Sequence, residues 1–123
     1  MILADTSIWI ELFRKGHLKR ELEELIDKEQ LCIHPFVIGE LACGYLPDRK
    51  KTLASFGVLI SLPTIKLDDV LAMVEARNLW GKGIGLTDAQ LIASCLASTG
   101  THIWTIDNAL GRIAASIGIL YQP

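Results

Sequence analysis

The sequence lacks the features of several specialised protein classes. Its 123 residues include only three cysteines and three histidines, and no uncharged apolar run is long enough to span a membrane. An odd number of cysteines without close pairs is a poor disulfide framework, and no histidine stands at zinc-ligand spacing from a cysteine. The cysteines all lie in apolar stretches, which predicts that they are buried: Cys32, Cys43 and Cys95.

Neither sign of charge dominates. Twelve Lys and Arg stand against 14 Asp and Glu, a net charge of −2, which argues against a protein that coats nucleic acid by bulk charge. The charge balance does not exclude a nucleic-acid enzyme with local basic patches. Apolar residues make up 50% and charged residues 21%, which excludes a disordered or collagen-like chain. The length predicts a single domain over residues 1–123. Because the first residues carry no basic segment typical of a signal peptide, we expect a reduced, soluble, cytoplasmic protein without a membrane partner.

Short apolar strands alternate with helices along the chain. The apolar runs predict strands at 2–4, 31–33, 58–62, 102–106 and 119–121. Apolar periodicity and capping residues predict helices at 8–13, 18–28, 35–45, 47–55, 68–80, 87–97 and 108–116. Thr87 and Gln90 have the spacing of a capping box. This alternation predicts a three-layer α/β/α domain around four or five parallel strands, with its site beyond the carboxyl ends of the strands.

Two acidic residues follow predicted strands directly. Asp5 comes after the strand at 2–4, and Asp107 comes after the strand at 102–106. Both therefore belong at the edge of the sheet where this architecture places its site. The alternative for each is a plain helix N-cap.

Two further acids are the only charges in strongly apolar helices. Glu40 lies in the helix predicted at 35–45, which is apolar nearly all round and is therefore expected to be buried. A buried carboxylate needs a proton, a metal ion or another cation, and an arginine salt bridge is the structural alternative. Asp88 stands in the first turn of the helix at 87–97, where the helix dipole alone could also favour it.

Four carboxylates gathered in one place would repel one another and raise their pKa values unless a cation compensates. An all-oxygen ligand set without histidine or cysteine favours Mg²⁺ or Mn²⁺. The corresponding chemistry is the attack of a metal-activated water on a phosphodiester.

The order and spacing of these acids resemble the PIN-domain family, in particular its VapC-type ribonuclease toxins. The resemblance covers nearly the whole chain and rests on four segments: Asp5-Thr6-Ser7 after the first apolar run, 37–44 (VIGELACG), 83–93 (GIGLTDAQLIA) and 104–107 (WTID). It implies a PIN-like α/β/α fold and a Mg²⁺- or Mn²⁺-dependent endoribonuclease, the toxin of a toxin–antitoxin pair. An RNA-processing role or a non-catalytic partner-binding PIN protein is the alternative.

By this resemblance four acids form the catalytic and metal-binding quartet: Asp5, Glu40, Asp88 and Asp107. Thr6 and Thr105 are candidates for hydrogen bonds to ligands or substrate. RNA is the implied substrate, a cognate antitoxin the implied partner, and a homodimer the implied assembly. The chain departs from many relatives after Asp107, where it has Asn108-Ala109-Leu110 and they have a further acid or a phenylalanine, which weakens the case for a second metal ion.

Two groups of basic residues follow elements that carry quartet members. Arg14 and Lys15 begin the first, and the full groups are Arg14, Lys15, His17, Lys19 and Arg20, and Arg49, Lys50 and Lys51. They are candidates for contacts to RNA phosphates, with solvated helix surface as the alternative. Two other phosphate-handling folds that begin with a strand and an acid fit less well, because dehalogenase-like phosphatases and receiver domains want a second early acid, and Ser7 stands there.

Overall fold

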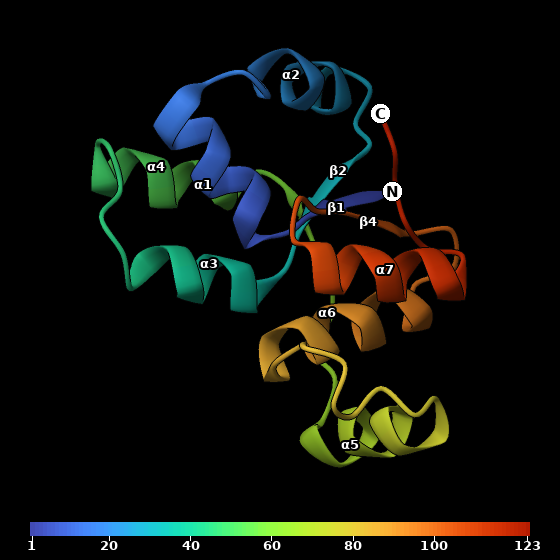
Figure 1. Ribbon diagram of the computed structural model, residues 1–123. Coiled ribbons are helices and arrows are strands. Elements are labelled where there is room, and N and C mark those ends of the chain that lie inside the picture. Colours follow the sequence, from blue (N-terminus) through green and yellow to red (C-terminus); the bar gives the residue numbers. More distant parts are fainter.

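Seven helices surround four short strands in alternating order (Figure 1). The structure is a computed structural model and describes residues 1–123. The elements are β1 Ile2–Ala4, α1 Thr6–Lys15, α2 Lys19–Asp27, β2 Leu31–Ile33, α3 Pro35–Ala42, α4 Arg49–Phe56, β3 Ile60–Ser61, α5 Leu67–Ala76, α6 Leu86–Ala97, β4 His102–Trp104 and α7 Asn108–Ile117. No helix is both long enough and apolar enough to cross a membrane.

The strands form one parallel sheet in the order β3-β2-β1-β4. Leu3 of β1 lies between Cys32 of β2 and Ile103 of β4. The predicted last strand is reduced to a single bridge from Ile103 to Leu120. From β1 the chain moves to β2 on one side, whereas β4 lies on the other, so the strand order reverses between β1 and β4. The carboxyl ends of these two strands therefore form the switch point at which such sheets place ligands.

Helices cover both faces of the sheet, which confirms the predicted three-layer architecture. Figure 1 shows α1, α2 and α4 on one side and α6 and α7 on the other, with α5 packed outside α6. Leu3 and Ala4 of the central strand are completely buried, and α6 is buried without interruption from Ala89 to Cys95. The apolar, non-alternating composition of the strands follows from this double cover.

Several element ends differ from the sequence prediction. α3 ends at Ala42 and α5 at Ala76, each about a turn before the predicted end. β4 ends at Trp104, so two residues separate it from Asp107. Cys43 follows the end of α3 and is exposed, whereas the other two cysteines are buried as predicted; all three are free thiols.

The predicted capping box at the start of α6 is wrong. Gly85 is the N-cap of α6, and no side chain caps the helix with a hydrogen bond. The side chain of Gln90 instead accepts from the Ile65 backbone N at 2.7 Å and donates to its carbonyl at 2.9 Å. Because Ile65 lies in the loop after β3, outside the sheet, its backbone groups need side-chain partners, and the buried amide supplies both.

His34 joins the helices that carry two of the predicted site residues. It is completely buried, and its Nδ1 accepts from the Phe36 backbone N at 2.9 Å, which caps α3. The proton of the neutral ring is therefore on Nε2, which donates to Ser94 Oγ of α6 at 2.8 Å. Ser94 Oγ donates in turn to the Pro63 carbonyl at 2.8 Å. This chain of hydrogen bonds fixes α3, which carries Glu40, against α6, which carries Asp88.

We expect His34 to make the stability of the fold depend on pH. Burial lowers the pKa of His34 below 6.5, and protonation at Nδ1 would place a proton against the Phe36 N–H. The contribution is therefore fully present above the unfolded-state pKa of 6.5 and is lost as pH falls below it. Urea unfolding at pH 7, 6 and 5 would measure this contribution as the difference in the free energy of unfolding between the wild type and His34→Asn. His34→Asn, which keeps an N-cap, should be less stable at pH 7 by about 1–3 kcal/mol and should show a weaker pH dependence.

His102→Asn is the matched control, since the His102 side chain makes no hydrogen bond in the structure. It should retain the wild-type pH dependence. An unchanged slope in His34→Asn would show that the buried imidazole is not the titrating group.

Candidate active site

Asp5 is the buried centre of the site. It directly follows β1, and the residue is only 4% exposed. Its Oδ1 accepts from the Ile8 backbone N at 3.2 Å and from Ser7 Oγ at 2.5 Å, and the Thr105 hydroxyl donates to its Oδ2. Asp5 is thus an N-cap for α1, as the structural alternative held, and also faces the end of β4. Burial raises the pKa of Asp5, while these hydrogen bonds act in the opposite direction.

The Thr105 hydroxyl connects the ends of β1 and β4. It donates to Asp5 and accepts from the Asp107 backbone N at 3.0 Å. Ser7 Oγ makes the parallel connection, since it donates to Asp5 and accepts from the Ile106 backbone N at 3.1 Å. Two hydroxyl groups therefore set where the segment after β4 lies relative to the buried carboxylate.

Asp107 is exposed and caps α7. Its Oδ1 accepts from the Leu110 backbone N at 2.9 Å. The N-cap alternative is therefore correct for Asp107 as it is for Asp5. Its other carboxylate oxygen has no hydrogen-bond donor within the chain and is available to a ligand.

Glu40 is exposed, so the expectation that it would be buried is wrong. α3 turns only Val37 and Leu41 fully into the core, because one face of the helix is left open beside α1. No arginine or lysine forms an ion pair with Glu40. Its Oε1 instead accepts from Thr6 Oγ1 at 2.6 Å, so α1 orients it toward the carboxyl edge of the sheet.

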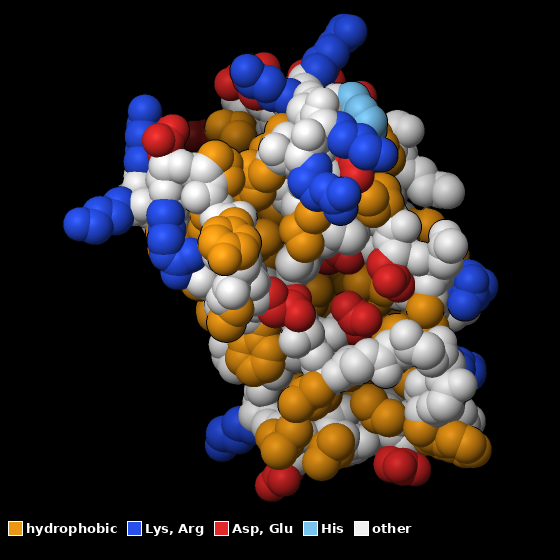
Figure 2. Space-filling model, turned by 60° about the vertical axis from the view of Figure 1, so that its left-hand side comes forward, with side chains coloured by type: hydrophobic (Ala, Val, Ile, Leu, Met, Phe, Trp, Pro, Cys, Tyr) orange, Lys and Arg blue, Asp and Glu red, His pale blue; other side chains and the backbone are white.

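The negative charges of all three other acids act on the carboxyl group of Asp88. Burial and the negative charges of its neighbours raise the pKa of Asp88 to about 6; the charges, in decreasing order, are those of Asp107, Asp5 and Glu40. Figure 2 shows acidic side chains gathered around a hollow on one face of the molecule. The chain thus brings together four carboxylates that are up to 102 residues apart in the sequence (107 − 5).

The four acids do not yet form a closed metal cage. No three Asp, Glu, His or Cys side chains lie close enough together to hold an ion as they stand. Glu40 is held by Thr6, and Asp107 by the start of α7. The donor set nevertheless fits a hard divalent cation, because it consists of carboxylate oxygens and their mutual repulsion is what such a cation relieves.

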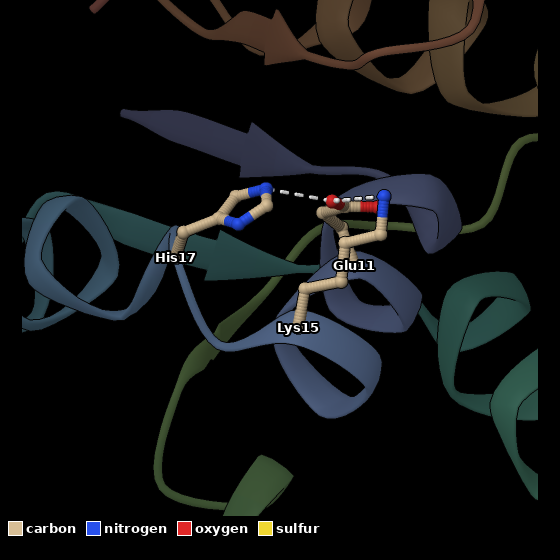
Figure 3. A network of polar contacts seen from close by, with 3 residues as sticks. All are labelled: Glu11, Lys15 and His17. Atoms are coloured by element: carbon tan, nitrogen blue, oxygen red, sulfur yellow. Dashed lines mark ion pairs between the residues drawn. The ribbon is translucent and has the colours of Figure 1, made fainter.

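The basic residues from the last turn of α1 to the start of α2 differ in what they contact. Arg14 has no ion-pair partner and lines a hollow of about 240 Å³ together with Glu40. Lys15 and His17 both bind Glu11, at 3.7 and 2.8 Å (Figure 3). Lys19 and Arg20 likewise pair with acids one turn along α2, as exposed contacts. Arg14 thus lies beside the site, whereas the other residues of this group fit the alternative of a solvated helix surface.

Arg49 of the second basic group is structural. Its guanidinium donates to the carbonyls of Ala42 at 2.6 Å and of Gly44 at 3.1 Å, and so satisfies carbonyl groups at the end of α3. The sequence predicts Arg49, with Lys50 and Lys51, as a candidate for RNA contacts.

Ser7 is a site residue that the sequence prediction lacks. A hydroxyl two residues after an acid at a strand end is a recognisable hydrogen-bonding signal.

Comparison with known proteins follows this geometry. A family model for the PIN domain matches residues 2–116. This match covers nearly the whole chain, and the chain belongs to the PIN-domain family.

Within that family the chain is similar to VapC-type proteins. It is 39% identical over 119 residues to Ribonuclease VapC32 of Mycobacterium tuberculosis, in strain CDC 1551 / Oshkosh and in strain ATCC 25618 / H37Rv; the match covers 97% of this chain and 94% of those proteins. The fold is similar to the crystal structure of PAE2754 from Pyrobaculum aerophilum, with a TM-score of 0.61 and 21% identity over 90% of this chain and 82% of that one. The resemblance inferred from the four segments is confirmed.

Removing the Thr105 hydroxyl should destabilise the fold. Thr105→Val keeps the shape of the side chain but leaves Asp5 Oδ2 and the Asp107 N–H without their partner. We expect a loss of about 1–3 kcal/mol in the free energy of unfolding at pH 7, measured by urea denaturation. Thr99→Val is the control, because Thr99 is exposed and its side chain makes no hydrogen bond; its effect should stay within about 0.5 kcal/mol. Equal effects of the two substitutions would mean that the hydroxyl does not support the carboxylate.

Proposed function

We propose that this protein is a metal-dependent endoribonuclease and the toxin of a toxin–antitoxin pair. One observation carries the proposal: Asp5, Glu40, Asp88 and Asp107 converge at the carboxyl ends of β1 and β4. The similarity to Ribonuclease VapC32 over nearly the whole chain supports RNA as the substrate. We assign the whole chain, residues 1–123, to a single PIN domain.

The four acids are the residues that would hold Mg²⁺ or Mn²⁺. When bound, such an ion would polarise the scissile phosphate and activate water for attack. The chain itself supplies the positioning. Ser7 and Thr105 hold the Asp5 carboxylate, Thr6 orients Glu40, and the first turn of α7 orients Asp107. Asp88 projects from the first turn of a helix that is fixed by its buried face.

The alternatives share the fold and differ in chemistry or in partner. A non-catalytic partner-binding PIN protein would not need four converging carboxylates, whose repulsion raises the pKa of Asp88. An RNA-processing enzyme would use the same site without an antitoxin. In the toxin assignment a cognate antitoxin binds the protein and obstructs the site. A small neighbouring gene that encodes a DNA-binding segment and a basic tail would favour the toxin.

Cleavage of RNA should require both a divalent ion and the acidic quartet. The purified protein would be incubated with single-stranded and structured RNA in Mg²⁺, in Mn²⁺ or in EDTA. We expect cleavage with either metal and none in EDTA, and a loss of about a hundredfold or more in Asp5→Asn and Asp88→Asn. The metals should also raise the thermal unfolding temperature of the wild type but not that of Asp88→Asn.

Asp69→Asn is the matched control, because Asp69 is also an acid in the first turn of a helix but belongs to α5, away from the site. It should cut RNA at the wild-type rate. Equal cleavage by every variant, or cleavage that persists in EDTA, would indicate a contaminating nuclease and refute the assignment.

We further propose a homodimer formed through the outer face of α5 and the start of α6. Four large apolar side chains are exposed there: Leu67 at 54%, Leu71 at 49%, Trp80 at 64% and Leu86 at 54%. Leu71, Trp80 and Leu86 also line one hollow of about 240 Å³. A cluster of exposed apolar residues on a small protein is typical of a protein–protein interface. Tryptophan is a common hot-spot residue in such interfaces.

Trp80→Ser should weaken this dimer. Sedimentation equilibrium should show a dimer for the wild type and a dissociation constant raised by about 30-fold or more for the variant. Val58→Ser, at another exposed apolar residue of 86% exposure, should leave the association unchanged. A monomeric wild type, or a dissociation constant that Trp80→Ser does not change, would refute the proposal that this face forms a dimer.

A further inference from the structure

A hollow beside α7 reaches the edge of the site. It has a volume of about 640 Å³ and lies between α7, the segment after β4 and residues 120–123. Thr105 and Asp107 line it, and both belong to the hydrogen-bonded centre described above. A group bound in this hollow would therefore lie beside Asp107, at the edge of the acidic quartet.

The hollow offers a cation and two amides. Asn108 and Arg112 stand four residues apart on α7, so they lie on the same side of the helix, and Gln122 faces them from the C-terminal segment. Arg112 forms no ion pair with any acid of the chain. No hydrogen bond engages the side-chain amides of Asn108 or Gln122, and both residues are exposed. Their donors and acceptors are free for a ligand.

Arg112 also belongs to a second, neighbouring hollow. That hollow has a volume of about 460 Å³ and contains Lys82, another cation without an ion-pair partner. Positive charge therefore continues from the rim of the site along α7. The hollow beside Glu40 on the other side of the site is smaller, at about 240 Å³, and apart from Glu40 and Arg14 its lining side chains are apolar or aromatic. The side-chain amides thus lie on the α7 side of the site.

We propose that the hollow beside α7 is a nucleotide subsite that sets the sequence preference of cleavage. Arg112 binds the phosphate next to the scissile one, and the amides of Asn108 and Gln122 bind the edge of the adjoining base. The volume lies within the range of sites for small ligands. An amide presents a donor and an acceptor together and can form a bidentate pair with the edge of a base. This inference rests on the proposed ribonuclease function.

The phosphate contact is tested by binding. Fluorescence anisotropy would follow short labelled oligoribonucleotides of different sequence on the full chain in EDTA, over a series of salt concentrations. Arg112→Gln should weaken binding about fivefold for every sequence and should reduce the slope of log affinity against log salt by about 0.7, the value for one phosphate contact on a single strand. Arg77→Gln is the matched control, since Arg77 is an exposed arginine at the end of α5 without an ion-pair partner and outside the hollow.

The base contact is tested by mapping the cut sites. A short random-sequence RNA would be digested in Mg²⁺ and the new ends sequenced. Asn108→Ala and Gln122→Ala should reduce the preference for the favoured base beside the cut by about tenfold, because each removes an amide that reads it.

The outcomes separate this inference from the function it rests on. If the wild type cuts RNA in a metal-dependent way but the three hollow variants match Arg77→Gln in affinity, salt slope and cut-site preference, the subsite is refuted and the ribonuclease stands. If the wild type shows no metal-dependent cleavage, the ribonuclease and the subsite fall together. Reduced affinity in Arg112→Gln with altered preference in Asn108→Ala and Gln122→Ala establishes the subsite.

Discussion

The burial of the Asp5 carboxylate is the constraint on which the rest of the site depends. A carboxylate next to the fully buried Ala4 loses its hydration, and the loss is large unless hydrogen bonds replace it. The replacements come from Ser7, Thr105 and the Ile8 N–H. Two of these donors also accept hydrogen bonds from the segment after β4. Satisfying one buried charge therefore also joins β1 to β4 at the carboxyl edge of the sheet, where Asp107 must lie.

The same arrangement changes what the net charge of the chain means. Four of the 14 acids converge at the carboxyl ends of β1 and β4, which leaves 10 acids against 12 basic residues, or +2, for the remainder. Three of the 12 basic residues are neutralised locally, because Lys15, Lys19 and Arg20 pair with acids one turn away. Arg14 and Arg112 are not paired and lie beside the site. A polyanion would therefore meet positive charge at the rim and would need a cation at the centre.

Sequence patterns located the acids better than their surroundings. Asp5 and Asp107 were predictable because strand ends of a parallel sheet share an edge, and both are also N-caps. The exposure of Glu40 was not, because composition makes α3 look buried on all sides while only one face meets the core. The partner of Gln90 was equally hidden, since the backbone of Ile65 lies 25 residues away and only the folded loop brings it near. Local rules reveal which side chains can bond, and packing decides to what.

The early end of β4 shows the same competition at the site itself. Residues 102–106 have the composition of a strand, yet pairing stops at Trp104. Continued pairing would have committed the backbone after Trp104 to the sheet ladder. Instead Thr105 accepts from the N–H two residues on, a turn that hydroxyl side chains favour, and its proton is directed at Asp5. The demand of the buried carboxylate for donors thus outweighs the strand preference of this segment, and the resulting turn places Asp107 at the head of α7, facing the acids of α3 and α6.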